Sequence, residues 1–270
     1  MPPALRVRDL MRKNLLTCPM TTTLGQAAAL LIRHRIHALI VTDELTHPAG
    51  LLSEVDLLAG EWLASNAEGL KVMKTMTAGQ MMSKPLATIE AEAPAAEAAA
   101  RMKREQIHRL IVTENEAAVG VISVSDLVGS LAHASLERRT VADAMSRGIV
   151  ICLEDTPIHS AARAMTERRS RSIIVVDVQG HSKGVVTGFD LLSIVETGDG
   201  TQTVAQIMRP PLTIAPTATL RQAADEMIRG HVHRLVVVDP AHPHGMPLGL
   251  ISTSDIVAEM AEPGSVWQAR

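Results

Sequence analysis

Aromatic residues are almost absent from this chain of 270 residues, which has one phenylalanine, two tryptophans and no tyrosine (Phe189, Trp62 and Trp267). The core must therefore be aliphatic, with the 14 methionines filling irregular gaps. Proteins that bind single-stranded nucleic acid stack bases on several aromatic rings, so this scarcity argues against that class. The net charge of −3 likewise gives no general attraction to nucleic acid or to an anionic membrane.

Cysteine and long apolar runs are scarce as well. Cys18 and Cys152 are too few for a disulfide or zinc framework. They occupy equivalent repeat positions and are most simply buried small apolar residues, with a redox role as the alternative. No apolar run approaches the roughly 20 residues that span a bilayer, and the first residues lack the apolar centre of a signal peptide. We expect a cytoplasmic protein with no membrane insertion and no nucleic-acid partner.

What the chain does have is one short pattern in four copies, hereafter the signature. It consists of a glycine, two apolar residues, Ser or Thr, two variable residues, an aspartate and an aliphatic pair. The copies are GLLSEVDLL (50–58), GVISVSDLV (120–128), GVVTGFDLL (184–192) and GLISTSDIV (249–257). Their aspartates are 64 to 70 residues apart, which indicates one supersecondary unit used four times.

Each signature closes a longer repeat. A Met-centred leading segment comes first: VRDLM (7–11), AGQMM (78–82), VADAM (141–145) or VAQIM (204–208). A short extended piece and a helical stretch follow, with apolar residues at three- and four-residue spacing. In the fourth repeat this stripe is Leu220, Ala223, Ala224, Met227 and Ile228. A corner that is basic or contains histidine then leads into a β-branched run, typical of a buried strand.

The predicted fold class is α/β (α+β repeats), with four β-α-β-β-α units in two paired modules. A unit of about 60 residues buries too little surface to be very stable alone, so units should pair. Residues 1–135 are predicted to form one pair and residues 136–270 the other. The predicted domains are repeat 1 (1–60), a linker helix (61–77), repeat 2 (78–135), repeat 3 (136–200) and repeat 4 (201–270).

The Ser/Thr and Asp of the signature have two interpretations. They fall where a strand gives way to a helix, so the hydroxyl can cap the helix and the aspartate can complete a variant capping box. The same carboxylate offers two acceptor oxygens for the paired hydroxyls of a ribose. The hydroxyl and the helix N-terminal amides can meet sugar or phosphate oxygens. The sequence leaves both interpretations open.

The corners also have two interpretations. Cations at the end of a helix complement its dipole. Four such corners near one axis would instead form a positive cluster that is costly unless anions fill it. The sequence leaves both interpretations of the corners open. The residues concerned are His37, His108, Arg109, Arg169, Arg171, His233 and Arg234.

The repeat resembles the cystathionine β-synthase (CBS) domain family, and the resemblance covers nearly the whole chain. It is carried by the leading methionine, the IHRLIV-type second strand and the GxxSxxD-type signature. The four-repeat layout is similar to that of the γ subunits of AMP-activated kinase. The chain departs from many members in having Ile40, Ile111, Ile174 and Val236 where they have proline, and Arg171 where its other corners have histidine.

The resemblance implies roles for named residues. Ribose would be bound by Asp56, Asp126, Asp190 and Asp255, supported at sugar or phosphate by Ser53, Ser123, Thr187 and Ser252. Phosphates would contact the corner residues. Adenine would lie among Leu16, Ile36, Ala87, Ile107, Val150, Leu212 and Val232. An aliphatic slot of this kind suits a chain with almost no aromatic residues.

No catalytic role is expected, because the His and Asp residues recur as repeat elements and not as one asymmetric constellation. Two His-x-His pairs, His231/His233 and His242/His244, make metal binding conceivable. The second pair lies in a proline-rich loop and lacks nearby cysteine or carboxylate partners, and no metal site is expected. The leading hypothesis is an energy-sensing regulatory protein. It would bind AMP, ADP or ATP between paired repeats, as a homodimer or an intramolecular four-repeat disc, and signal to an unknown effector protein. The alternatives are an oligomerisation module with vestigial clefts, or a regulator that binds S-adenosylmethionine.

Overall fold

A computed structural model describes residues 5–13, 15–58, 74–130, 139–168, 170–197, 202–243 and 245–261. Both tryptophans, Arg169, His244 and most of the predicted linker helix (61–77) lie outside these residues. The chain divides into two compact units. Unit 1 comprises Met1–Leu15, Ala87–Gly148 and Leu212–Arg270, and unit 2 comprises Leu16–Leu86 and Ile149–Pro211. Among the described residues, no helix combines the length and apolarity that crossing a membrane would need.

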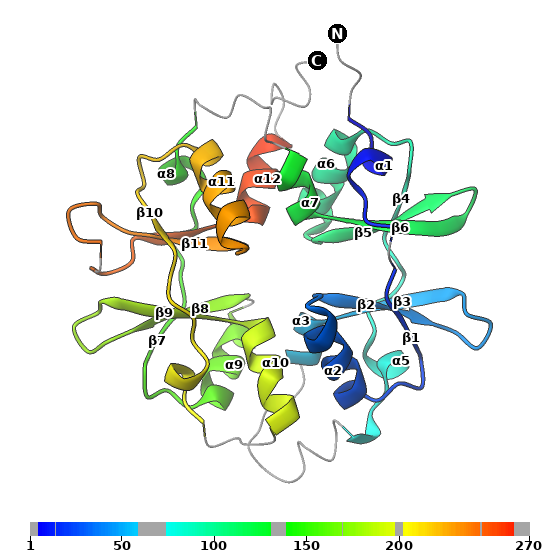
Figure 1. Ribbon diagram of the computed structural model, residues 1–270, viewed down its shortest axis with the longest axis horizontal. Coiled ribbons are helices and arrows are strands. Elements are labelled where there is room, and N and C mark those ends of the chain that lie inside the picture. The colour runs from blue at the N-terminus through cyan, green and yellow to red at the C-terminus, as the bar shows by residue number, and fades with distance from the viewer. Residues whose placement is uncertain are drawn as a thin grey trace. The chain divides into compact units, whose positions relative to one another are not determined.

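Each repeat contains one three-stranded sheet, in which the first strand pairs parallel to the second and the second pairs antiparallel to the third. A helix connects the first two strands, and another follows the third (Figure 1). The parallel step needs this crossover helix, whereas the antiparallel step needs only a turn. The predicted β-α-β-β-α unit is therefore confirmed in all four repeats.

The elements of unit 1 belong mainly to repeats 2 and 4. They are α1 (Val7–Leu10), β4 (Thr88–Glu90), α6 (Ala95–Glu105), β5 (Arg109–Glu114), β6 (Ala117–Ser123), α7 (Val124–Gly129), α8 (Val141–Ala144), β10 (Thr213–Ile214), α11 (Leu220–Gly230), β11 (Arg234–Val237), β12 (Gly249–Ser252) and α12 (Thr253–Met260).

The elements of unit 2 belong mainly to repeats 1 and 3. They are β1 (Thr17–Pro19), α2 (Leu24–His34), β2 (Ala38–Thr42), β3 (Pro48–Ser53), α3 (Glu54–Leu58), α5 (Ala78–Met81), β7 (Ile151–Leu153), α9 (Ile158–Glu167), β8 (Ser172–Val176), β9 (Ser182–Thr187), α10 (Gly188–Thr197) and the 3-10 helix η3 (Val204–Gln206).

The compact units do not follow chain order. In unit 1, α12 of repeat 4 packs on α6 and α7 of repeat 2, and one continuous core joins the two repeats (Figure 1). In unit 2, α10 of repeat 3 packs on α2 and α3 of repeat 1. Leu192 enters the core of repeat 1, and Leu58 enters that of repeat 3. The compact units thus group most of repeat 2 with repeat 4 and most of repeat 1 with repeat 3. The predicted pairs, residues 1–135 and 136–270, are instead linked through their leading segments, each of which packs on the other repeat of its pair. Closing helices with apolar faces can pack on any repeat, and sequence pattern does not specify which.

Helix α11 shows how the local sequence specifies an element. The Thr219 hydroxyl accepts a hydrogen bond from the Gln222 backbone N–H at 3.1 Å, which begins the helix with a capping box. The helix ends at His231, whose φ of 51° is left-handed. The first four residues of the predicted stripe are buried, namely Leu220, Ala223, Ala224 and Met227. Ile228, the fifth, is 45% exposed, so the prediction was one residue too wide.

The leading segments explain why both a methionine and a glycine recur. Each leading methionine packs directly over the signature glycine of another repeat in the same unit, so Met11 of repeat 1 covers Gly120 of repeat 2. The other pairs are Met82 on Gly50, Met145 on Gly249 and Met208 on Gly184. Repeats 1 and 2 thus exchange leading segments, as do repeats 3 and 4. Glycine is needed because a side chain there would occupy the space of the methionine sulfur.

Replacing Gly120 by alanine should test this packing. The new methyl group would lie 2.8 Å from Met11 Sδ and 2.9 Å from the Arg12 carbonyl oxygen. Overpacking of this kind costs about 1–3 kcal/mol of unfolding free energy, which urea denaturation would measure. Gly129→Ala in α7 is the matched control, because nothing lies within 4 Å of its added methyl group. Equal stability of the two variants would contradict the packing role of the signature glycine.

Candidate functional site

The signature and the corner are brought together by the antiparallel strand pair of each repeat. In repeat 2, Arg109 pairs with Ser123, and the Val124 N–H donates to the carbonyl oxygen of His108 at 3.0 Å. The corresponding strand pairs are Ala38–Ser53, Ser172–Thr187 and Arg234–Ser252. The carbonyl oxygens of His37, Arg171 and His233 accept from the first residue of the closing helix in the same way. Every predicted corner that the structure describes therefore lies beside its own signature.

The residues predicted to wall an adenine lie on the other side of the second strand. The carbonyl oxygens of Leu16, Ala87, Val150 and Leu212 each accept a backbone hydrogen bond from that strand, at 2.9–3.0 Å. Leu16 is 36% exposed and Leu212 is 41% exposed, so both side chains are accessible to a ligand. Ile36, Ile107 and Val232 are half-buried just before the same strand. Each repeat thus presents partly exposed aliphatic side chains next to its corner.

The four signature aspartates form the predicted helix caps. Asp126 Oδ2 accepts from the Ser123 N–H at 2.9 Å and from the Ser123 hydroxyl at 2.5 Å. Asp56, Asp190 and Asp255 make the same two bonds with Ser53, Thr187 and Ser252. Capping therefore occupies one carboxylate oxygen, Oδ2, in every repeat. It leaves Oδ1 as the oxygen whose surroundings differ from repeat to repeat.

The partners of Oδ1 come from the leading segments. Asp126 Oδ1 accepts from Arg12 Nε at 2.8 Å, and Asp190 Oδ1 accepts from Arg209 Nε at 2.6 Å. Asp56 Oδ1 instead accepts from the Ser83 hydroxyl at 2.8 Å. These contacts were not predicted from the sequence. The available signal was the residue directly after each leading methionine, which is Arg, Ser, Ser and Arg in repeats 1 to 4.

The Asp255 carboxylate is partly desolvated, so a further hydrogen-bond donor would stabilise its charged form. Burial raises its pKa above the ordinary value, and the Ser252 hydrogen bonds and the charge of Arg234 oppose that rise. A desolvated carboxylate is stabilised by each additional hydrogen bond to its charged form. A hydroxyl group from a ligand could supply such a bond.

The corner of unit 1 joins repeats 2 and 4 reciprocally. His108 Nδ1 lies 3.2 Å from the Ser254 hydroxyl, and His233 Nδ1 lies 3.1 Å from the Ser125 hydroxyl. Each serine occupies the second variable position of the signature in the opposite repeat. Arg109 and Arg234 follow the two histidines directly in sequence. Unit 1 therefore gathers imidazole and guanidinium groups at one corner, with a serine hydroxyl beside each ring.

The corner of unit 2 differs in charge. His37 Nδ1 lies 2.9 Å from Glu54 Oε2, and the Glu54 side chain is only 11% exposed. The Phe189 ring of repeat 3 packs at 5.4 Å from the His37 ring. Glu54 and Phe189 were not predicted as site residues, because both occupy variable positions of the signature. Glu54 places a carboxylate where unit 1 has the apolar Val124 of repeat 2, so the two units do not offer an anion the same surroundings.

Neither cysteine has the surroundings of a reactive thiol. Cys18 is buried in the core of repeat 1, and Cys152 packs half-buried against the core of repeat 3. Burial raises the pKa of both thiols, whereas reactive cysteines have a lowered pKa. Within the described ranges, no group of three or more His, Cys, Asp or Glu side chains could hold a metal ion.

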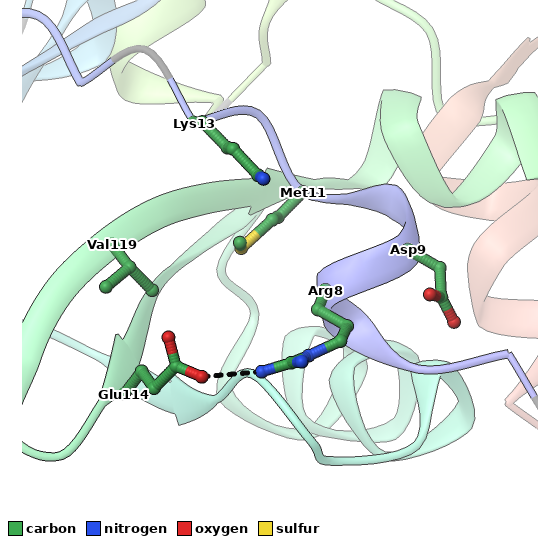
Figure 2. Close-up of a pocket in the computed structure, with 6 residues that line it drawn as sticks. All are labelled: Arg8, Asp9, Met11, Lys13, Glu114 and Val119. Carbon is green, nitrogen blue, oxygen red and sulfur yellow. Dashed lines mark hydrogen bonds and ion pairs between the residues drawn. The ribbon is translucent and has the colours of Figure 1, made fainter.

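A pocket of about 320 Å³ lies between α1 and the β5–β6 hairpin (Figure 2). Its lining is formed by Arg8, Asp9, Met11, Lys13, Glu114 and Val119. Arg8 crosses it to form ion pairs with Glu114 and Glu92, both at 2.6 Å. Predicted site residues are absent from this lining. The two ion pairs of Arg8 link α1 to repeat 2.

Comparison with known proteins identifies the repeat. A family model described as the CBS domain matches residues 7–61, 78–133, 141–197 and 204–262. The 5′-AMP-activated protein kinase subunit gamma-3 of Sus scrofa is 27% identical over 64% of this chain and 38% of its own length. The L-aspartate semialdehyde sulfurtransferase of Methanocaldococcus jannaschii is 30% identical over 41% of this chain and 21% of its own length.

A solved structure resembles the chain over nearly its whole length. Protein MJ1225 of Methanocaldococcus jannaschii, a proposed archaeal homologue of g-AMPK, superposes with a TM-score of 0.80 at 17% identity. The match covers 94% of this chain and 99% of that protein. At this identity the likeness shows the fold. The two curated relatives are much longer than the matched region, so the chain spans well under half of either one.

Proposed function

The chain belongs to the CBS domain family, and from that premise we propose that it is a non-catalytic regulatory protein that binds an adenine nucleotide beside its signatures. The observation that carries the proposal is the adjacency, within a repeat, of three groups of suitable chemistry. A signature carboxylate oxygen would accept ribose hydroxyls. The corner of unit 1 would meet phosphate. The exposed aliphatic side chains, Leu16 and Leu212 among them, would contact adenine.

The chemistry of these groups favours an adenine nucleotide over other small ligands. A carboxylate beside a serine hydroxyl matches a vicinal diol. Histidine and arginine donors next to helix N-termini match phosphate oxygens. The gamma-3 relative is a subunit of a kinase activated by 5′-AMP, which is consistent with such a ligand. Its ligand would be AMP, ADP or ATP, and the response would pass to a partner protein in an energy-sensing role.

Calorimetric titration with AMP, ADP and ATP tests the proposal. Asp255→Asn should weaken binding about tenfold or more, because a hydrogen bond to a charged group contributes roughly 1.5–3 kcal/mol. Asp239→Asn, in the exposed turn after β11, is the matched control and should bind as the parent does. If the parent bound none of the three nucleotides, the proposal would be wrong.

A melting-temperature shift separates this function from a purely structural role. A ligand that binds only the native state must raise stability, by an amount that grows with the logarithm of its concentration above Kd. An oligomerisation module with vestigial sites would melt at the same temperature with or without millimolar nucleotide.

A second candidate ligand is favoured by Glu54 in unit 2. S-adenosylmethionine carries adenosine and a positive sulfonium group but no phosphate, and a half-buried corner that contains a carboxylate suits a cation better than an anion. Titration with S-adenosylmethionine should then depend on Glu54 and not on His108 or His233. Equal sensitivity to all three residues would argue against this candidate.

A further inference from the structure

We propose that the residue after each leading methionine decides which signature aspartates can bind a ribose. Asp56 and Asp255 accept a ligand, whereas Asp126 and Asp190 are held by the chain's own arginines. The inference rests on the proposed nucleotide function and specifies which of its sites are used. We call Arg12, Ser83, Ser146 and Arg209 the post-methionine residues.

The post-methionine residues occupy one equivalent backbone position. Arg12 and Val121 exchange two backbone hydrogen bonds, at 2.8 and 2.9 Å. Ser146 and Leu250 exchange two bonds at 2.9 Å. Ser83 pairs with Leu51, and Arg209 pairs with Val185, in the same way. In each case the partner directly follows the signature glycine. The backbone of every post-methionine residue is therefore held in the same position relative to the signature that it pairs with. At this position, only the side chain differs from repeat to repeat.

Arginine at this position covers the carboxylate. The side chains of Asp126 and Asp190 are only 8% and 5% exposed, whereas Arg12 and Arg209, which bond to their Oδ1 atoms, are 71% and 68% exposed. The guanidinium thus lies on the solvent side of a nearly buried carboxylate. A ribose hydroxyl would have to displace a charge-assisted hydrogen bond and replace a cation with a neutral donor, which is unfavourable for a buried carboxylate.

Serine at this position leaves the carboxylate oxygen available. The Ser83 hydroxyl is small and neutral and can rotate away from Asp56 Oδ1 without removing a charge. In repeat 4, no side chain in the described part of the chain donates a hydrogen bond to Asp255 Oδ1. Ser146, its post-methionine residue, is exposed. Each unit thus has one aspartate held by arginine and one beside serine. Asp255 belongs to unit 1 and Asp56 to unit 2.

An exchange of serine and arginine tests the inference on the full chain. Equilibrium dialysis and calorimetry with AMP would count sites on the parent, on the double variant Arg12→Ser/Arg209→Ser and on the reverse variant Ser83→Arg/Ser146→Arg. Each substitution introduces a residue that the same backbone position already carries in another repeat. Folding of the variants is checked by their melting curves. We expect two sites on the parent, four on the serine variant and none on the arginine variant.

The possible outcomes distinguish a failure of this inference from a failure of the proposed nucleotide binding. Four sites on the parent, or an unchanged number on the serine variant, would overturn the role of the post-methionine residues and leave nucleotide binding standing. Weaker binding by the serine variant would make Arg12 and Arg209 ligand contacts, which also overturns it. If neither the parent nor the serine variant bound AMP, ADP or ATP, the proposed function itself would be overturned, and this inference with it.

Discussion

Replacing His108 and His233 together by alanine is expected to weaken ATP binding by about a hundredfold or more, because each loses a charge-assisted hydrogen bond of roughly 1.5–3 kcal/mol to phosphate. Adenosine, which has no phosphate, should bind the variant as tightly as the parent. The two rings come from different repeats, and each is bonded to a serine of the opposite repeat. These contacts orient both imidazoles at one corner. Calorimetry with ATP and adenosine measures the difference.

His37→Ala is the matched control for this experiment. His37 holds the same repeat position as His108, but its Nδ1 lies against the Glu54 carboxylate. A phosphate brought to that corner would meet a carboxylate, and like charges repel. We therefore expect His37→Ala to change ATP affinity much less than the unit 1 substitutions. Equal losses for ATP and adenosine in the His108/His233 variant would show that the histidines shape the fold and do not contact phosphate.

The difference between the two corners has a consequence for ligand choice. If Asp255 and Asp56 are the open aspartates, the open site of unit 1 lies beside His233, and that of unit 2 lies beside His37 and Glu54. The first should favour ligands with several phosphates, and the second should favour ligands with few or none. A chain with two dissimilar sites can respond to two adenosine compounds at once, and a ligand shifts a conformational equilibrium only by its differential affinity for the two states.

The sequence predicted the repeat well because its strands and helices carry local signals. The runs before Asp43 and Asp177 are β-branched and continuous, and they form β2 and β8. The Ser-to-Asp spacing predicted the caps, which are present in all four repeats. These features depend on neighbours within a few positions, so a single sequence specifies them.

The features that the sequence did not reveal depend on contacts between distant residues. Arg12 meets Asp126 across 114 positions, and Met11 covers Gly120 across a similar span. Ser125 and His233 lie 108 positions apart. Nothing in the spacing of one repeat indicates which other repeat supplies its partner. The grouping of repeat 1 with repeat 3 and of repeat 2 with repeat 4 in the compact units could not be predicted for the same reason, because it depends on contacts between distant residues.

Leu220→Ala should cause the largest loss of stability among single substitutions considered for unit 1. Leu220 is fully buried at the start of α11, and deleting a buried leucine side chain costs about 2–5 kcal/mol through lost burial and the cavity left behind. Ile228→Ala is the matched control from the same predicted stripe. Because Ile228 is 45% exposed, its truncation should change the unfolding free energy by about 0.5 kcal/mol or less.

Ligand addition turns the Leu220→Ala variant into a test of which unit binds. Unit 1 contains Leu220, His108, His233 and Asp255, so ATP bound there should raise the melting temperature of the weakened unit. Leu24→Ala makes the equivalent cavity in unit 2, because Leu24 is also fully buried at the start of its helix. ATP should protect this second variant less, since the unit 2 corner contains Glu54. Equal protection of both variants would mean that the carboxylate does not distinguish the two corners.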